Sequence, residues 1–249
     1  MPSAVLGPLF PHFLNMFKIT IDINALSFYD LNKFKLNTFK PEAGLTMICT
    51  VYQPSSETIR AFLRQQADVS FSYPEVGHSR HTPPAGYVVD HNRICLGEGE
   101  ACFNAARDAL HAWRMFPTGW VKLCWPTAPI APGTDVAILA HWGALWWLNA
   151  CRIVYVIDEH APQRRCGFAY GALASHAARG EERFCIEMAG DGTVWYDLLA
   201  FSKPNRLLTR LGYPFVRRLQ KRFAAQSLKA MAEAVSHANW PSAGGRTDG

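Results

Sequence analysis

Residues 166–204 contain three strand-like runs that are separated by turn signals. Apolar and polar side chains alternate in residues 182–188 and 193–201, which is typical of strands with one buried face. A Gly-Asp-Gly sequence at residues 190–192 lies between these two runs and predicts a tight hairpin turn. Because consecutive strands joined by so short a turn pair with each other in opposite directions, this stretch predicts the centre of an antiparallel sheet.

Residues 136–157 are almost continuously apolar, and their length is close to that of a helix that spans a membrane. Asn149 and Arg152 interrupt the run, and an arginine near the middle of a bilayer costs about 2.5–3.5 kcal/mol on insertion scales. The β-branched residues 153–157 also favour a strand. We therefore expect two buried strands rather than a membrane helix, with Gly143 and Asn149 at turn or bulge positions.

Amphipathic patterns predict helices on either side of this sheet. Residues 102–116 repeat apolar side chains at helical spacing until Pro117 and Gly119 end the segment. A longer pattern begins at residues 213–214, where a proline occupies the expected first turn. Its apolar stripe consists of Val216, Leu219, Phe223, Ser227 and Met231.

Four shorter segments complete the predicted order. Ser55 or Ser56 is expected to cap a short helix with Glu57 in its first turn. The prolines and glycines of residues 74–86 predict a loop. Residues 86–96 then predict a strand, and alternation places Val89, His91, Arg93 and Cys95 on one of its faces. Residues 202–205 are expected to end the last strand of the sheet and to cap a helical turn over residues 206–211.

Composition excludes several classes of protein. Hydrophobic residues make up 49% of the chain and charged residues 18%, which suits a folded domain with a sizeable core. The cysteines are odd in number and include no C-x-x-C pair, so neither a disulfide framework nor a zinc site is predicted. The net charge of +5 is concentrated near the C-terminus, in Arg217, Arg218, Lys221 and Arg222. This cluster predicts either peripheral contact with anionic lipid headgroups or an ordinary solvent-exposed face of a helix. No nucleic-acid partner is predicted.

Residues 1–46 differ from the rest of the chain, because they contain four lysines but none of the seventeen arginines. Prolines and the missing basic start argue against a secretory signal, and the lack of arginine argues against a transit peptide. Two interpretations stay open: a weakly ordered extension, or an upstream start with the true start at Met47. We expect one domain over residues 47–235 and a frayed tail over residues 236–249.

The order of strand, helix, antiparallel meander and long C-terminal helix predicts an α+β fold in which a curved sheet grips the last helix. This order resembles the START-like, helix-grip architecture. Four stretches of residues 51–235 also resemble, in order and spacing, the domain-of-unknown-function nineteen-ninety family of plants, algae and actinobacteria. They are HNRICLGEGEACFNAARDALHAW, FAYGALASHAARGEERFCIE, GDGTVWYDLLAFSKP and LGYPFVRRLQKRF.

The resemblance implies a helix-grip fold with an apolar cavity, but it supplies no established reaction. Plant members of the family are associated with the plastid outer envelope and with cation-selective pore behaviour. The sequence therefore predicts a module that binds a small apolar ligand or lipid in its cavity. A cation-permeable protein of the plastid outer envelope and an enzyme acting in the cavity are the alternatives. The expected location is the plastid outer envelope or the cytoplasm.

Candidate site residues come from the polar positions within these predicted strands. His176 and Glu182, with Glu181, lie around Gly180 and would either act as a base with its orienting carboxylate or bridge a turn. If Arg93 faces the cavity it needs a partner, for which Glu182 is the candidate and Asp158 and Glu159 are the alternatives. No metal, cofactor or catalytic residue is predicted, since the spacing of His91, His176 and Glu182 carries no metal-ligand signal and no nucleophile or phosphate-binding motif is present. The predicted ligand-binding residues are His91, Arg93, Tyr170, His176, Glu182 and Trp195.

Overall fold

The computed structural model describes residues 48–116, 119–205 and 212–237, which all fall within one compact unit. The expected N-terminal extension over residues 1–46, the helical turn over residues 206–211 and nearly all of the expected tail lie outside the described residues. Within the described part, the predicted order of strands and helices is confirmed.

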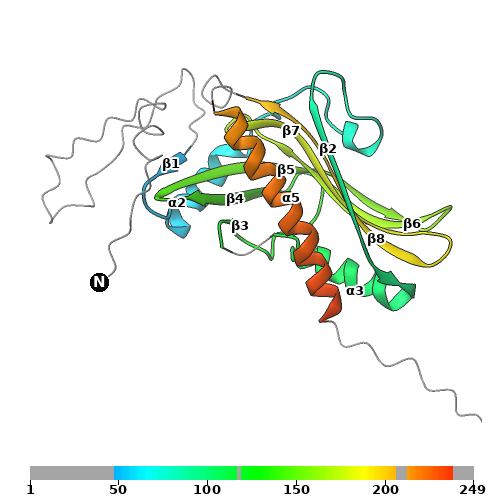
Figure 1. Ribbon diagram of the computed structural model, residues 1–249. Helices are drawn as coiled ribbons and strands as arrows, with labels where there is room; N and C mark the ends of the chain where they lie inside the picture. Colours follow the sequence, from blue (N-terminus) through cyan, green and yellow to red (C-terminus); the bar gives the residue numbers. More distant parts are fainter. Residues whose placement is uncertain (1–47, 117–118, 206–211, 238–249) are drawn as a thin grey trace, which may run out of the picture. The chain divides into compact units, whose positions relative to one another are not determined.

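The strands form one antiparallel sheet in which neighbours in the chain are mostly neighbours in space (Figure 1). The order across the sheet is β2-β8-β7-β6-β5-β4-β3, and β1 pairs with β5 beside this path. The described strands are β1 (Ile48–Thr50), β2 (Val88–Glu98), β3 (Val121–Leu123), β4 (Asp135–Trp142), β5 (Leu145–Glu159), β6 (Arg164–Ala172), β7 (Ala178–Met188) and β8 (Thr193–Pro204).

In the described part of the chain, three α-helices pack on the two faces of this sheet. The long helix α5 (Tyr213–Ser236) crosses the inner face, where it contacts β2, β8 and α3 (Gly99–His111) (Figure 1). Helix α2 (Ser56–Gln66) covers the outer face at β4 and β5, and the Ser55 side chain caps it by accepting a hydrogen bond from Thr58. The fold is therefore the predicted α+β helix grip.

The main core lies between the inner face and the helices α3 and α5. Phe168, Phe184 and Tyr196 are fully buried there and come from adjacent strands. The Tyr196 hydroxyl forms a 2.9 Å hydrogen bond with the Ser227 hydroxyl of α5, which explains a serine within an apolar stripe. Met231 continues this stripe in the core, whereas Val216, Leu219 and Phe223 are half-buried.

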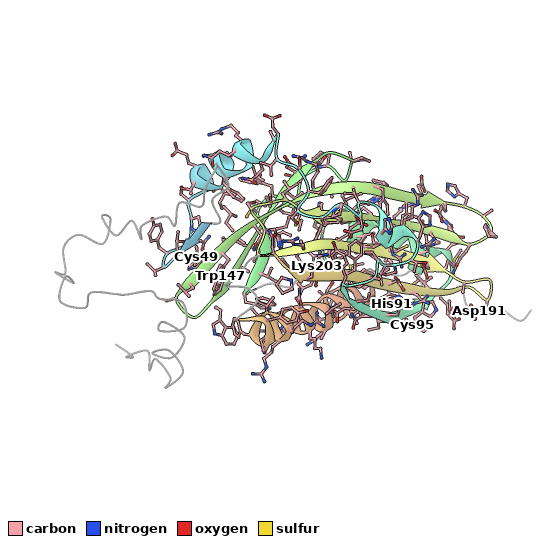
Figure 2. The ribbon with its side chains drawn as sticks, turned by 90° about the horizontal axis from the view of Figure 1, so that it is seen from above. Cys49, His91, Cys95, Trp147, Asp191 and Lys203 are labelled. Atoms are coloured by element: carbon pink, nitrogen blue, oxygen red, sulfur yellow. The ribbon has the colours of Figure 1, made fainter. Side chains whose placement is uncertain are left out.

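Tight turns and bulges shape the sheet. The hairpin between β7 and β8 turns at Asp191, whose carboxylate accepts hydrogen bonds from the backbone and side chain of Thr193 (Figure 2). Pairing shifts register at Cys95 and Gly97 of β2 and again between Ile153 and Tyr155 of β5. Such bulges increase local twist and so help the sheet to curl around α5.

Residues 136–157 form strands, as predicted. The turn between β4 and β5 lies at Gly143, which has a positive φ of 56°. Asn149 lies within β5, so its expected place at a turn or bulge was wrong. Among the described residues, no helix is long and apolar enough to cross a membrane.

Two predicted boundaries were wrong. The helix predicted over residues 102–116 ends at His111, although Trp113 and Met115 beyond it remain buried in the core. Strand β8 continues through Pro204 rather than ending at Ser202, because β7 begins at Ala178 and supplies it with a partner. Gly180 therefore lies inside a strand, where the carbonyl of Phe201 would come within 2.0 Å of an added Cβ. A glycine here permits close pairing of strands rather than a turn.

Candidate functional site

A cavity of about 240 Å³ lies between the inner face of the sheet and α5. Seven strands, β2 to β8, contribute to its lining, and most of the side chains that surround it are apolar. The apolar side chains from the strands, and from the segment between α3 and β3, include Phe116, Trp120, Val121, Ile138, Ala140, Cys151, Leu198 and Ala200. Helix α5 closes the cavity with Val216, Leu219, Phe223 and Ala224.

The carboxyl group of Glu182 is the acid that β7 contributes to this cavity. The Tyr170 hydroxyl of β6 donates a hydrogen bond to Oε2 of Glu182 at 2.5 Å. No other hydrogen bond or ion pair to this carboxyl group is found within the described part of the chain. Burial raises the pKa of Glu182 to about 7, and the nearby charge of Asp90 acts in the same direction.

A second acid, Asp90 of β2, also lines the cavity but is fully matched by a cation. Arg217 of α5 donates two parallel hydrogen bonds to the two carboxylate oxygens of Asp90, at 2.5 and 2.6 Å. Gln220 accepts a further hydrogen bond from Arg217 and donates one to the Ser202 hydroxyl. This cluster ties α5 to the edge of the sheet beside the cavity. It also removes Arg217 from the basic group that was expected to be free for a membrane surface.

His176 lines the cavity from the turn between β6 and β7. Its Nδ1 accepts a hydrogen bond from the backbone N–H of Ala178 at 3.0 Å, so the turn-bridging interpretation is supported. Burial lowers the pKa of His176 to about 4, and the imidazole is therefore neutral at neutral pH.

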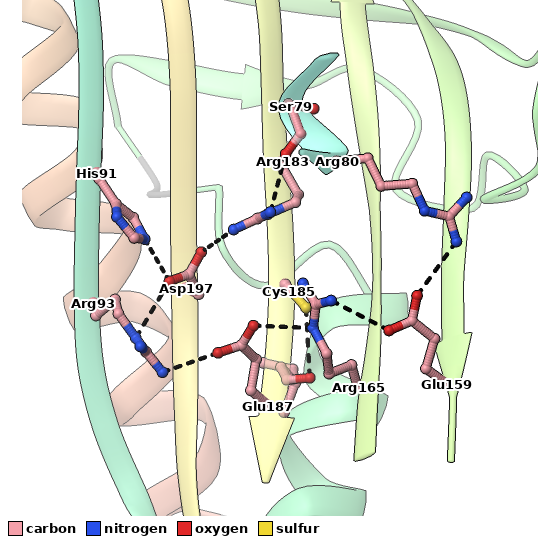
Figure 3. A network of polar contacts seen from close by, with 11 residues as sticks. Ser79, Arg80, His91, Arg93, Glu159, Arg165, Arg183, Cys185, Glu187 and Asp197 are labelled. Atoms are coloured by element: carbon pink, nitrogen blue, oxygen red, sulfur yellow. Dashed lines mark hydrogen bonds and ion pairs between the residues drawn. The ribbon is translucent and has the colours of Figure 1, made fainter. Parts of the chain in front are cut away.

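His91, Arg93 and Trp195 lie on the outer face, away from the cavity. The expected pair of Arg93 and Glu182 does not form. Arg93 instead contacts Glu187 at 2.9 Å and Asp197 at 3.2 Å, as Figure 3 shows. The alternation that groups His91 with Arg93 is right, but it cannot tell which face is inner. The two β2 side chains that do line the cavity are Asp90 and Asn92.

The outer-face residues form an extended ion-pair network that the sequence did not predict (Figure 3). Asp197, only 2% exposed, binds His91, Arg93 and Arg183 at 2.6 to 3.2 Å. Arg165 joins Glu187 to Glu159 and so continues the network across the sheet. The expected partners Asp158 and Glu159 thus do not bind Arg93. The conceivable metal group of His91, His176 and Glu182 is also separated, because the first lies on the opposite face from the others.

Glu181 and Glu182 point to opposite faces although they are adjacent in sequence. Glu181 is 3% exposed and fixes the loop before β2 to the outer face. Its carboxylate accepts hydrogen bonds from the Tyr73 hydroxyl at 2.8 Å and from the backbone of Gly77 and Ser79 at 2.7 and 3.0 Å, together with one from the Ser79 hydroxyl. Glu181 therefore has a structural role.

The remaining basic side chains of the α5 cluster are solvent-exposed. Arg218 and Lys221 lie on its outer side, and Arg222 stacks over Trp120 and Trp142 with 5.0 and 6.0 Å to the ring centres. The Trp142 side chain is 43% exposed, so an apolar surface adjoins these cations near the cavity.

Comparisons with known proteins place this cavity in a family context. The model of the family described as "Domain of unknown function (DUF1990)" matches residues 72–230. A UPF0548 protein of Dictyostelium discoideum is 32% identical over 202 residues, which cover 74% of this chain and 94% of that protein. A UPF0548 protein of Arabidopsis thaliana is 34% identical over 155 residues, covering 61% and 75%. A solved structure of a hypothetical protein from Helicobacter pylori has 8% identity and a TM-score of 0.40, covering 66% of this chain and 95% of that one.

Proposed function

The chain belongs to the DUF1990 family, and we propose that it binds a compact, mainly apolar ligand between the sheet and α5. One observation carries this proposal: a partly enclosed cavity of about 240 Å³ is lined mainly by apolar side chains and contains a few inward-facing polar groups. Binding sites for small molecules commonly combine an apolar lining with a few polar groups that fix orientation. Tyr170, His176 and Glu182 supply such groups here, whereas His91, Arg93 and Trp195 would not contact a ligand in this cavity.

The size of the cavity favours a compact ligand over a long-chain lipid. Pockets for drug-sized ligands span about 300–1,000 Å³, and the present cavity falls below that range. A two-ring aromatic or a short aliphatic compound suits this volume better than a lipid with extended acyl chains. An enzymatic role and a cation-permeable role in the plastid outer envelope remain predictions from the sequence, as does the location.

Filling the cavity tests this proposal. Ala200 of β8 borders the cavity and is half-buried, so Ala200→Leu is expected to occupy part of the space that a ligand needs. We expect the variant to bind a neutral naphthalene derivative at least about tenfold more weakly, equivalent to about 1.4 kcal/mol. Isothermal titration calorimetry measures the change.

Ala225→Leu provides the matched control, because Ala225 is exposed on α5 and does not border the cavity. This variant is expected to bind as the unmodified protein does. Equal binding by all three proteins would place the compound elsewhere and contradict the proposal.

A peripheral membrane contact is a second candidate, favoured by the exposed Trp142 with Arg222 over its ring and by the exposed Arg218 and Lys221 on the same helix as Arg222. Tryptophan is enriched at membrane interfaces, and each basic residue near an anionic surface contributes about 1 kcal/mol. Reversing the three charges to glutamate is expected to abolish cosedimentation with vesicles containing phosphatidylserine. Cosedimentation of the variant to the same extent would remove this candidate, and phosphatidylcholine vesicles serve as the control for charge.

A further inference from the structure

We propose that the ligand carries a protonated amine, which binds the carboxyl group of Glu182 inside the cavity. This inference rests on the proposed function, because it names the chemical class of the ligand for the same site. A carboxylate has two oxygens with about four acceptor positions between them. Tyr170 fills one of these positions, from β6. The other acceptor positions of the carboxyl group have no donor among the described residues. Because Glu182 lines the cavity, a ligand in the cavity can donate hydrogen bonds to them.

The other charged side chains that border the cavity are Asp90, Arg179 and Glu181, and the Glu181 carboxylate is held on the outer face by Tyr73, Gly77 and Ser79. Asp90 is held by both terminal nitrogens of Arg217. Arg179 also borders the cavity, but it donates to the backbone carbonyl of Asn205 at 3.1 Å and its charge acts on Tyr87. Of the two carboxyl groups that face into the cavity, Asp90 and Glu182, only Glu182 lacks a basic partner within the described residues. A ligand with a positive charge would supply that partner.

The physical chemistry of the site favours a cation over a neutral or anionic group. Burying an unpaired carboxylate is costly, and an ammonium group removes this cost by forming charge-assisted hydrogen bonds. Aromatic side chains in the lining, Phe116 and Trp120 among them, suit the apolar part of such a ligand and attract cations to their ring faces. An anionic ligand would instead meet the carboxyl group of Glu182.

Binding of an ammonium group is also expected to release a proton from Glu182. Tyr170 on β6 and Asp90 on β2 act on this carboxyl group, and its charge in turn acts on Cys151 of β5 and Tyr196 of β8. Asp90 is already paired with Arg217, and burial raises the pKa of Tyr170, Cys151 and Tyr196 well above their usual ranges. Glu182 is therefore the group that titrates near neutral pH, and a bound cation favours its ionised form.

Three probes with one naphthyl skeleton test the inference: naphthylethylamine, naphthylethanol and naphthylacetate, which are cationic, neutral and anionic. We expect the unmodified protein to bind the amine at least about tenfold more tightly than the alcohol, and the acetate most weakly. Glu182→Gln keeps the size of the side chain but removes its charge. This change is expected to reduce amine affinity about tenfold and so to remove most of the preference for the amine over the alcohol.

Proton release supplies a measurement that does not depend on the variant. Calorimetry in two buffers of different ionisation enthalpy should show release of about half a proton at pH 7 when the amine binds and none when the alcohol binds. Equal affinities for amine and alcohol would overturn the inference and leave the proposed function standing. Amine binding that persists in Glu182→Gln would overturn it as well. If none of the probes binds, or if Ala200→Leu weakens none of them, the proposed function fails too.

Discussion

Replacing Glu181 by alanine is expected to destabilise the protein by about 3–5 kcal/mol. Its carboxylate is buried and accepts four hydrogen bonds from Tyr73, Gly77 and Ser79. Without the carboxylate these donors lose their acceptor in a region that excludes water, and the loop before β2 loses its attachment to the outer face. Urea unfolding at neutral pH measures the loss. Hydrogen exchange should in addition show faster exchange of the Gly77 and Ser79 amides.

Glu182→Gln is the matched control for this experiment, since it changes the next residue of the same strand. The Glu182 carboxyl has one hydrogen-bond donor, Tyr170, and burial disfavours its charged form. The control is therefore expected to be at least as stable as the unmodified protein at neutral pH. A loss of less than about 1 kcal/mol in Glu181→Ala, or equal losses in both variants, would contradict the structural role assigned to Glu181.

Much of the fold follows from local pattern. The alternation in residues 182–188 and 193–201, the Gly-Asp-Gly turn and the stripe of α5 all predict elements that the structure confirms. Gly180 misled the prediction, because glycine signals a turn in sequence but here allows the backbone of β8 to approach. The difference depends on a strand that pairs from elsewhere in the chain, which no local pattern contains.

The candidate site was only partly predictable for a related reason. Alternation tells which residues of a strand share a face, but the inner face is decided by where α5 packs. Arg93 and Glu182 were thus assigned to one cavity, although they lie on opposite faces. The bidentate pair of Asp90 and Arg217 joins residues 127 positions apart, and neither position carries a sequence signal for the other. Such pairs become visible only in three dimensions.

Glu182 and His176, whose pKa values burial shifts in opposite directions, are expected to oppose each other in the pH dependence of stability. The folded pKa of Glu182, about 7, lies above its ordinary value of 4.5. Folded protein thus keeps this proton while unfolded protein releases it, and stability falls as pH rises from about 4.5 to about 7. The folded pKa of His176, about 4, lies below its ordinary value of 6.5. Unfolded protein binds that proton first, so stability rises over about pH 4 to 6.5.

Each pKa shift corresponds to a change of about 3 kcal/mol in the free energy of unfolding. Between about pH 4.5 and 6.5 the fall due to Glu182 and the rise due to His176 nearly cancel. Glu182→Gln should remove the falling part and gain stability relative to the unmodified protein as pH rises toward 7. His176→Asn, which keeps an acceptor for the Ala178 amide, should gain relative stability as pH falls. Urea unfolding across this pH range measures the free energy of unfolding of both single variants and of the double variant. Subtracting the value of the unmodified protein at each pH removes the contribution of all other titrating groups. Curves that run parallel to that of the unmodified protein would show that the cavity does not shift these two pKa values, because only a group with different folded and unfolded pKa values changes the slope.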